Sequence, residues 1–419
     1  MEHRPRSHAP VPAQARGAQQ RRAGMLLAIC LAACTLPLHA GASGYEASGE
    51  APHPARLLWG DTHVHTAWSS DSYLFGNRRL GPEEAFRFAR GETVTASNGQ
   101  RARLQRALDF LVIADHAENL GMMHYIASGD PAAMATPNAE RWRARLAEIG
   151  GQTGAFKQIF AELGNPELRD ERARRTIWQD YVAMADSADT PGVFSTLVGF
   201  EWSSTPGGNN LHRVVIFRDG AGKADRVLPF AEFDSQYPED LWSYLADYHA
   251  RIGGEVLAIP HNANGSNGLM FPVTMRDGRP VDKAWAEARQ RWEPLVEATQ
   301  IKGDSESHPL LSPEDEFAGY SVWDKGNLLV TQRKEPAMLH GDYVRPALRA
   351  GLAIAARTGV NPYRFGLIGS TDTHTSLSTA DDTAFWGGNP DNEPGPDRME
   401  RVLIPSPLDP AMNVMSWEQ

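Results

Sequence analysis

The chain has 419 residues, which at roughly 150 residues per domain allows two or three ordinary domains or one large barrel with insertions. Hydrophobic residues make up 41% and charged residues 22%, close to an average globular protein, so extensive disorder is excluded. Asp and Glu total 52 against 41 Lys and Arg, a formal net charge of −11. This acidic balance argues against nucleic acid as a partner, because phosphate backbones are bound through clustered positive charge.

Residues 1–43 have the layout of a secretory signal. Basic Arg16, Arg21 and Arg22 precede an apolar run at 25–38, and small residues follow it. We therefore expect the protein to be exported to the periplasm. A transmembrane anchor is disfavoured, because about 20 apolar residues are needed to span a bilayer and a proline interrupts this run.

Both cysteines, Cys30 and Cys34, lie within this leader. The segment 31–34 resembles the bacterial lipobox, in which the cysteine is lipidated after cleavage, so Cys34 could attach the protein to a membrane. The small residues at 40–42 would instead suit soluble release, and both routes stay open. Because no cysteine follows, any metal must be held by nitrogen and oxygen ligands.

A loose Gly/Ser/Ala/Pro linker runs to about residue 54, and residues 55–419 predict one barrel-like domain. Helix-like stretches at Pro82–Arg90, Leu241–Arg251 and Tyr343–Arg357 separate short apolar runs that end in polar residues. This alternation predicts an α/β fold with a parallel sheet or barrel that opens into functional loops. The seven expected strands are Leu57–Trp59, Phe110–Ala114, Phe194–Phe200, Val214–Phe217, Val256–Ile259, Leu295–Ile301 and Phe365–Ile368.

Two stretches break this rhythm. The first, about 119–191, is rich in Ala, Arg and Glu and has helical periodicity around Trp142–Ile149 and Arg172–Met184, which predicts a helical insertion. The second, about 303–341, is irregular and punctuated by prolines. Both are too long for simple connections, so we expect them to form lids or substrate walls.

Six of the fourteen histidines fall at polar strand ends beside a carboxylate or amide. The strongest motif contains Asp61, His63 and His65. Residues two apart in a strand face the same way, so both imidazoles can address one metal. Asp61 has the same parity and could accept a ring N–H and orient a ligand histidine. In isolation, a chance His-x-His on a solvated strand is the alternative.

Two further motifs place charge directly after apolar strands. Asp115 and His116 follow the second expected strand, where a charged pair must find a partner or face water. Glu201 follows the third, where an unpaired carboxylate would be strongly disfavoured. A bridging metal ligand accounts for Glu201, and a buried ion pair with an arginine is the competing explanation.

The remaining motifs repeat this pattern. His212 opens the fourth strand, His261 ends the fifth, and Asp372 and His374 lie two apart in a Gly-Ser-Thr loop. Taken singly, such a histidine is more often a hydrogen-bonded core residue, and Ser, Thr and Asp are common in ordinary loops. Recurrence at successive strand ends is what predicts one shared site.

The order of these motifs resembles the PHP (polymerase and histidinol phosphatase) superfamily. The phrases at Leu58–Thr66 and Asn210–Phe217 more closely resemble a bacterial branch labelled a domain of unknown function. The resemblance covers about Leu57 to the end and implies a distorted (β/α)7 PHP-type barrel with metals at the C-terminal strand ends. Sequences of this branch continue past the counterpart of 417–419, so we also expect a C-terminally truncated chain.

The resemblance implies nine metal ligands, enough for two or three divalent ions such as Zn, Mn or Fe. Asp71 stands where the family often has another histidine or a carboxylate, and its oxygen would make the third metal site favour a harder cation. The implied ligands are His63, His65, Asp71, His116, Glu201, His212, His261, Asp372 and His374.

Such a site predicts a metal-dependent hydrolase that cleaves a small-molecule ester, most simply a phosphoric ester, with a metal-bridging hydroxide. Asp372, His374 and Asp61 are the candidate catalytic residues, and a metal-bound water is another possible proton donor. Two alternatives stay open: a non-catalytic periplasmic metal-binding protein, and a carbohydrate-binding protein that uses some of the eleven tryptophans. The sequence lacks a Walker loop, a dinucleotide fingerprint and a Gly-x-Ser-x-Gly elbow, which weakens other enzyme classes.

Candidate substrate contacts lie in the loop after the sixth expected strand. Lys302, Asp304 and His308 offer a cation, a carboxylate and an imidazole. Lys302 could bind a phosphate oxygen, with a surface salt bridge as the alternative. Trp68 and Trp202 neighbour the motifs and could wall an apolar pocket, although buried tryptophans are more often core residues.

Overall fold

A computed structural model describes residues 56–149, 165–379, 381 and 383–415. The expected signal segment with Cys30 and Cys34 lies outside the described residues, as do 150–164 of the expected helical insertion and the last four residues. Leu58–Gln419 form one unit, and Met1–Leu57 form a separate one. In the part of the chain that is described, no helix has the length and apolar character needed to cross a membrane.

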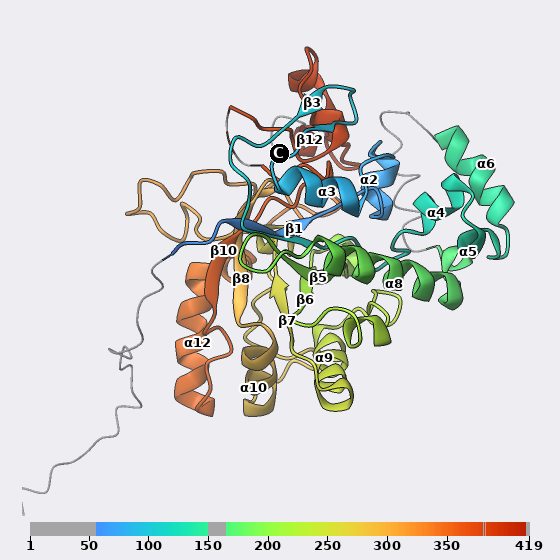
Figure 1. Cartoon of the computed structure of the whole chain (residues 1–419). Coiled ribbons are helices and arrows are strands. Elements are labelled where there is room, and N and C mark those ends of the chain that lie inside the picture. Colours follow the sequence, from blue (N-terminus) through green and yellow to red (C-terminus); the bar gives the residue numbers. More distant parts are fainter. Residues whose placement is uncertain (1–55, 150–164, 380, 382, 416–419) are drawn as a thin grey trace, which may run out of the picture. The chain divides into compact units, whose positions relative to one another are not determined.

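The unit that begins at Leu58 has a mixed α/β architecture with a curled half-barrel sheet (Figure 1). Its five-stranded sheet has the order β1-β4-β5-β6-β7, and a three-stranded sheet has the order β10-β8-β9. Two small hairpins, β2-β3 and β11-β12, lie outside these sheets. The strands are β1 (Gly60–Val64), β2 (Val94–Thr95), β3 (Arg101–Ala102), β4 (Phe110–Ile113), β5 (Ser195–Trp202), β6 (Arg213–Phe217), β7 (Val256–Pro260), β8 (Leu295–Gln300), β9 (Gly303–Asp304), β10 (Gly366–Gly369), β11 (Val402–Ile404) and β12 (Val414–Met415).

The first strand starts later than the sequence predicts. β1 begins at Gly60, where it pairs in parallel with Phe110 of β4, whereas Leu58 and Trp59 are 60% and 57% exposed. The expected strand at Leu57–Trp59 is therefore wrong. The apolar pattern misleads here because β1 itself carries polar residues on its inner face.

The expected parallel order holds for only part of the sheet. β1, β4 and β5 pair in parallel, as do β8 and β10, but β6 pairs antiparallel with both β5 and β7. The loop Ser203–His212 between β5 and β6 is too short for a helical crossover, which needs a dozen or more residues. It therefore returns the chain as a hairpin.

A single parallel bridge joins β1 to the chain that follows β10. Val64 pairs with Thr373, and the N–H of His65 donates to the carbonyl of Thr373 at 2.8 Å. The N–H of Asp372 donates to the carbonyl of His63 at 2.9 Å. Within the described ranges, no ladder connects β7 to β8. The bridge brings the first and last histidine motifs together.

The expected helices at Pro82–Arg90, Leu241–Arg251 and Tyr343–Arg357 are confirmed as α3, α9 and α12, and helices α4 to α6 and α8 occupy the described parts of 119–191 (Figure 1). The α-helices are α2 (Ser70–Leu74), α3 (Pro82–Ala89), α4 (Met122–Ser128), α5 (Pro131–Met134), α6 (Ala139–Ile149), α8 (Glu171–Ala188), α9 (Pro238–Ile252), α10 (Lys283–Trp292), α11 (Leu339–Asp342) and α12 (Val344–Thr358).

Local sequence signals set the ends of these helices. α8 begins at Asp170, whose carboxylate accepts the N–H of Ala173 at 2.9 Å and so satisfies one of the free first-turn donors. α9 begins with a proline, which has no N–H to satisfy, and it ends at Gly253 with φ 72°. Caps of this kind fix where each helix meets the sheet.

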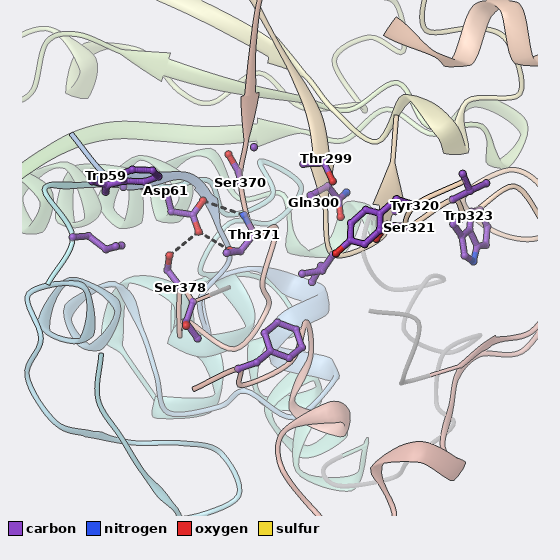
Figure 2. A pocket seen from close by; sticks show the side chains of 18 of the residues that line it. Trp59, Asp61, Thr299, Gln300, Tyr320, Ser321, Trp323, Ser370, Thr371 and Ser378 are labelled. Carbon is purple, nitrogen blue, oxygen red and sulfur yellow. Dashed lines mark hydrogen bonds between the residues drawn. The ribbon is translucent and has the colours of Figure 1, made fainter. Parts of the chain in front are cut away.

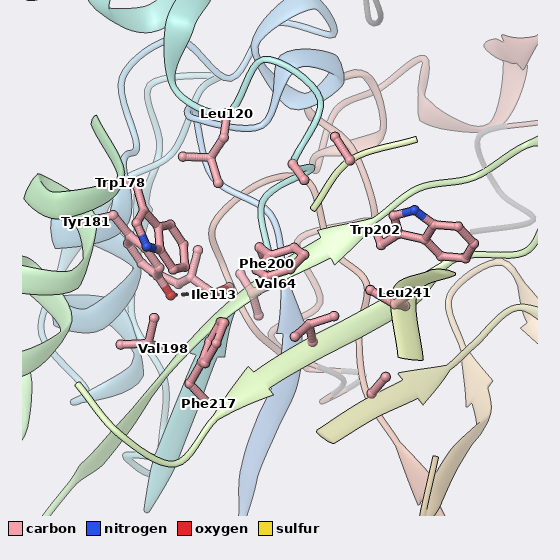
Figure 3. Close-up of a cluster of buried hydrophobic side chains, with 14 of the residues drawn as sticks. Val64, Ile113, Leu120, Trp178, Tyr181, Val198, Phe200, Trp202, Phe217 and Leu241 are labelled. Atoms are coloured by element: carbon pink, nitrogen blue, oxygen red, sulfur yellow. Dashed lines mark hydrogen bonds between the residues drawn. The ribbon is translucent and has the colours of Figure 1, made fainter. Parts of the chain in front are cut away.

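Period-two alternation divides the strands between two faces. On β5, Val198, Phe200 and Trp202 join the large hydrophobic core under the helices, where Trp178 and Tyr181 of α8 also pack (Figure 3). Each fully buried side chain of this size contributes about 1.5–3 kcal/mol relative to exposure. The alternate residues of the same strands therefore face the inside of the curl, where the histidine motifs lie.

A buried ion triad lies among the helix-facing residues. Arg213 of β6 contacts Glu293 at 3.0 Å, and Arg289 of α10 contacts the other oxygen of Glu293 at 3.0 Å. Trp242 donates to the same carboxylate at 2.8 Å. Burial alone would raise the pKa of Glu293, but the two guanidinium groups outweigh it and lower that pKa. The Glu293 carboxylate therefore stabilises both buried guanidinium groups in a region that is shielded from water.

Replacing Glu293, the residue directly after α10, should destabilise the fold more than replacing an exposed acid on that helix. We expect Glu293→Ala to lower the free energy of unfolding by about 3–5 kcal/mol, because two buried guanidinium groups lose their counter-charge. Glu287→Ala, which removes an exposed pair with Lys283, should cost about 0–1 kcal/mol. Urea unfolding of both variants measures the difference, and equal costs would contradict the buried triad.

Candidate metal centre

Glu201 stands at the centre of the site, on the inner face of β5. Its neighbours in the strand, Phe200 and Trp202, point into the helix-facing core, so alternation turns the carboxylate inward. Gly199 precedes it on the same face, where a Cβ would lie 2.6 Å from Val112. The glycine lets the strands approach closely behind the carboxylate, which is 1% exposed.

Five imidazoles surround the two oxygens of this carboxylate. Such crowding exceeds what hydrogen bonds to two oxygens accommodate, since a carboxylate offers about four lone-pair directions and Ser203 already donates to one of them at 2.7 Å. Oε1 lies 2.7 Å from Nδ1 of His212 and 3.1 Å from Nδ1 of His116, while Oε2 lies 2.9 Å from Nε2 of His63, 3.2 Å from Nε2 of His65 and 3.3 Å from Nε2 of His261.

Asp372 completes the group around His63 and His65. Its Oδ1 lies 3.3 Å from Nε2 of His63 and 3.2 Å from Nε2 of His65. Its Oδ2 accepts hydrogen bonds from the Nε2 amide of Gln300, at 3.0 Å, and from the ammonium of Lys302. Asp372 has φ 53°, a conformation that costs about 1–3 kcal/mol for a residue other than glycine. The surrounding contacts keep Asp372 in this strained backbone conformation.

Asp71 forms a second carboxylate centre on the other side of His116. Its Oδ2 lies 3.0 Å from Nε2 of His116 and 2.8 Å from Nε2 of His374. Its Oδ1 accepts from the hydroxyl of Ser69 at 2.9 Å and from the N–H of Ser72 at 2.6 Å. Because His116 contacts Glu201 through its other nitrogen, the two carboxylate centres share one imidazole.

Glu297 of β8 belongs to the site, although the sequence analysis does not identify it. Its Oε2 lies 3.1 Å from Nδ1 of His63, and the side chain is fully buried. A carboxylate that holds the far nitrogen of an imidazole fixes the ring orientation and makes the other nitrogen a better ligand. The available signal is a lone acid between two apolar residues of the strand, Val296 and Ala298.

The ionisation states suit cation binding. Burial alone would raise the pKa of Glu201, but His116, His212 and His261 outweigh it and hold that pKa well below the ordinary value. Burial lowers the pKa of His212 to about 4, and it does the same for His374 despite the opposing charge of the nearby carboxylate. Ionised carboxylates and neutral imidazoles are the forms that bind metals.

His63 shows where positive charge is needed. Burial disfavours a charged imidazole, yet Asp372 and Glu297 outweigh this and hold the pKa of His63 well above its ordinary value. The surrounding carboxylates therefore demand a cation, which is either a proton on the ring or a metal ion beside it.

Buried atoms without hydrogen bonds provide a second indication that these residues fit metal ions. Both ring nitrogens of His261 and Oδ1 of Asp372 are buried and lack a hydrogen-bond partner. An unsatisfied buried polar atom is costly, so its presence calls for a ligand. Four sets of mutually close donor atoms could hold a cation: His65, Asp71, His116 and His374; His63, His65, Glu201 and Asp372; His63, His261 and Glu297; and Glu201, His212 and His261.

Asp61 does not orient a histidine ring, contrary to the expectation from its parity. Its carboxylate accepts the N–H of His63 at 2.9 Å and the hydroxyls of Thr371 and Ser378 at 2.6 and 2.7 Å (Figure 2). The register of β1 shifts between Asp61 and Val64, which breaks the alternation on which the expectation relied. Asp61 instead anchors the loop that carries Asp372, and it faces a separate cavity of about 860 Å³.

Of the three expected substrate contacts, only Lys302 lines the cavity that reaches the metal centre. Asp304 accepts the N–H groups of the two residues at 306 and 307, and His308 lies 3.1 Å from Asp324. These two side chains therefore serve the loop itself. Lys302 pairs with Asp372 and has a side chain only 19% exposed, so it does not form a surface salt bridge.

The packing also decides the roles of Trp68, Trp202, Glu201 and Asp115 that the sequence left open. Trp68 and Trp202 belong to the hydrophobic core rather than to a pocket wall. The carboxylate of Glu201 faces imidazoles, and the buried arginine nearest in sequence, Arg213, pairs with Glu293 instead. Asp115 accepts from the N–H and hydroxyl of Thr66 at 2.6 and 2.7 Å, so it braces the first motif.

A cavity of about 310 Å³ opens onto these groups. Asp71, His116, Glu201, Asp372 and His374 contribute to its floor. The volume lies at the lower end of the roughly 300–1,000 Å³ that is usual for small-molecule sites. The clustered donors are therefore accessible to a small ligand.

The fold and the clustered donors together define a mixed α/β protein with a candidate multinuclear metal centre. The chain belongs to the family described as Protein of unknown function (DUF3604), whose sequence model matches residues 52–413. A comparison with curated proteins finds no match.

Glu297 should control metal affinity through His63. We expect Glu297→Gln to weaken binding of the tightest divalent ions by about 10- to 100-fold, because the ring of His63 loses its carboxylate partner. Asp304→Asn is the matched control, since that carboxylate lies outside the cluster and should leave metal affinity unchanged. Titration with a competing chelator, followed by elemental analysis, measures both variants. Equal affinity in the two variants would count against the role of Glu297.

Proposed function

We propose that the protein is a metal-dependent hydrolase of the PHP type that cleaves a small phosphoric ester. The observation that carries this proposal is the crowding of five imidazoles around the two oxygens of Glu201 beneath an open cavity. The Glu201 carboxylate and the imidazoles beside each of its oxygens would together hold two cations close to each other. The curled sheet, in the same proposal, is a distorted (β/α)7 barrel.

Two or three bound divalent ions, with Zn, Mn and Fe as candidates, would acidify a water molecule and withdraw charge from the ester oxygens. The chain's own groups hold the reacting centre in place. Glu201 and Asp372 supply fixed negative charge, while Glu297 orients His63. Burial of this whole set excludes bulk water, which strengthens every charge interaction within it.

Lys302 is the chain's own candidate for contact with the substrate anion. Its ammonium lies at the cavity against Asp372, so it can donate to an ester oxygen without leaving its counter-charge. His374 is the chain's own candidate for handing a proton to the leaving oxygen. Asp372 stays ionised, because His63 and Lys302 outweigh the effect of burial and hold the pKa of that carboxylate well below its ordinary value. The net charge and the small cavity favour a small-molecule substrate over nucleic acid.

Export is part of the same proposal. The basic and apolar layout of residues 1–43 supports delivery to the periplasm, either as a soluble protein or attached through a lipidated Cys34. A metal-binding protein without catalytic activity uses the same donor set, and turnover is what separates it from the proposed hydrolase.

Metal content and ester cleavage should fall together when the first motif is removed. We expect the double variant His63→Ala and His65→Ala to lose bound metal and at least about 10³-fold in kcat/KM, because His65 belongs to two of the donor sets. Elemental analysis and a panel of phosphomonoesters, phosphodiesters and sulfate esters measure both. Metal binding without cleavage of any ester would establish the non-catalytic alternative, and lost cleavage with unchanged metal content would contradict the ligand role.

Lys302 should affect catalysis without affecting metal content. We expect Lys302→Ala to lower kcat/KM by about 10- to 100-fold, the loss of one charged hydrogen bond to the substrate. Lys283→Ala removes an exposed lysine from α10 and serves as the control. Unchanged kinetics in Lys302→Ala would assign this lysine only to the pairing with Asp372.

A further inference from the structure

Five large apolar residues line the cavity at the candidate metal centre. Leu328 and Leu329 come from the irregular segment 303–341, Leu403 and Ile404 come from β11, and Phe75 follows α2. Three segments that are far apart in sequence thus bring five large apolar side chains to a cavity whose other lining groups include the metal-binding carboxylates and imidazoles. The donor set explains none of these five residues.

The backbone around these side chains is held in place. The N–H of Leu328 donates to the carbonyl of Gly265 at 3.1 Å, and the N–H of Leu329 donates to the carbonyl of Gly208 at 3.3 Å. In β11, Ile404 pairs with Val414 of β12, and Leu403 is only 5% exposed. The segments that carry these apolar lining residues are therefore fixed by backbone contacts.

The charges along the cavity exclude a highly charged ligand. Among the described residues that line it, Lys302 is the only lysine or arginine, and Asp372 already pairs with it. Glu232 lines the same cavity and adds negative charge. A second phosphate or carboxylate on the substrate would meet this acid, and the described lining residues offer it no free lysine or arginine.

We propose that the substrate is a small ester whose organic group is uncharged and apolar, and that Leu328, Leu329, Leu403, Ile404 and Phe75 hold this group while the ester anion meets the metal centre. This inference rests on the proposed hydrolase function. Nucleotides, sugar phosphates and other esters with polar or doubly charged organic groups are disfavoured, because a polar group placed against these five apolar side chains would lose its hydration there.

Binding of phosphonates that cannot be hydrolysed tests this subsite independently of turnover. The metal-loaded full chain should bind phenylphosphonate at least about tenfold more tightly than methylphosphonate in calorimetry, because only the former reaches the apolar lining residues. Leu329→Asn should remove most of that difference and leave methylphosphonate affinity unchanged. Leu408→Asn, at a leucine that is 55% exposed and outside the cavity, is the matched control and should retain the full preference.

Turnover then separates this inference from the function on which it rests. Benzyl phosphate should be cleaved with at least about tenfold higher kcat/KM than glycerol phosphate, which carries the same anion on a polar group and likewise releases an alkyl alcohol. Equal affinities for the two phosphonates, or faster cleavage of glycerol phosphate, would overturn the apolar subsite. A preference for phenylphosphonate without cleavage of either ester would support the subsite and refute the hydrolase.

Discussion

The placement of the Glu201 carboxylate, buried on the inner face of β5, is the constraint on which the rest of the site depends. Removing a charged carboxylate from water costs several kcal/mol unless opposite charge or hydrogen bonds replace the lost hydration. Imidazoles supply that replacement from every side, and His63, His65 and His261 share one of its oxygens. Neutral imidazoles alone cannot satisfy it, because a neutral ring donates through only one nitrogen. Cations placed among these donors would satisfy the carboxylate, so we expect metal binding to stabilise the fold.

Two opposite requirements meet in each central strand. The helix-facing side must be apolar, and Phe200 and Trp202 satisfy it, while the inner side must present ligands, and Glu201 satisfies it. Strand alternation allows one short sequence to do both. The bridge between Val64 and Thr373 then places the first motif beside the last, although the two lie far apart in the sequence. Backbone pairing therefore sets the distances between donors, and side-chain packing on the other face holds that pairing in place.

The sequence predicts the donors more fully than the architecture. Nine side chains named from motif order and resemblance converge on one site. Most of them stand on a strand or next to a strand end, whereas Asp71 lies on α2. Glu297 was missed because it lies within a strand rather than after it, where a single acid between Val296 and Ala298 has no motif to mark it. The role of Asp61 was wrong because alternation cannot reveal a register shift inside β1. The antiparallel direction of β6 likewise depends on loop length, which apolar patterning does not report.

The residues that would select a substrate come from a different part of the sequence than the residues that would react with it. The donors lie on or next to strands, where backbone pairing fixes them, whereas Leu329 and Leu403 come from an irregular segment and a short hairpin. A site divided in this way can change its apolar wall without disturbing the carboxylates and imidazoles, since loops tolerate substitution better than the scaffold that carries them. Lys302 lies at the boundary between the two, because it lines the cavity and also neutralises Asp372. A change at Lys302 therefore alters the charge beside Asp372, whereas a change at Leu329 alters only the shape and polarity of the cavity lining.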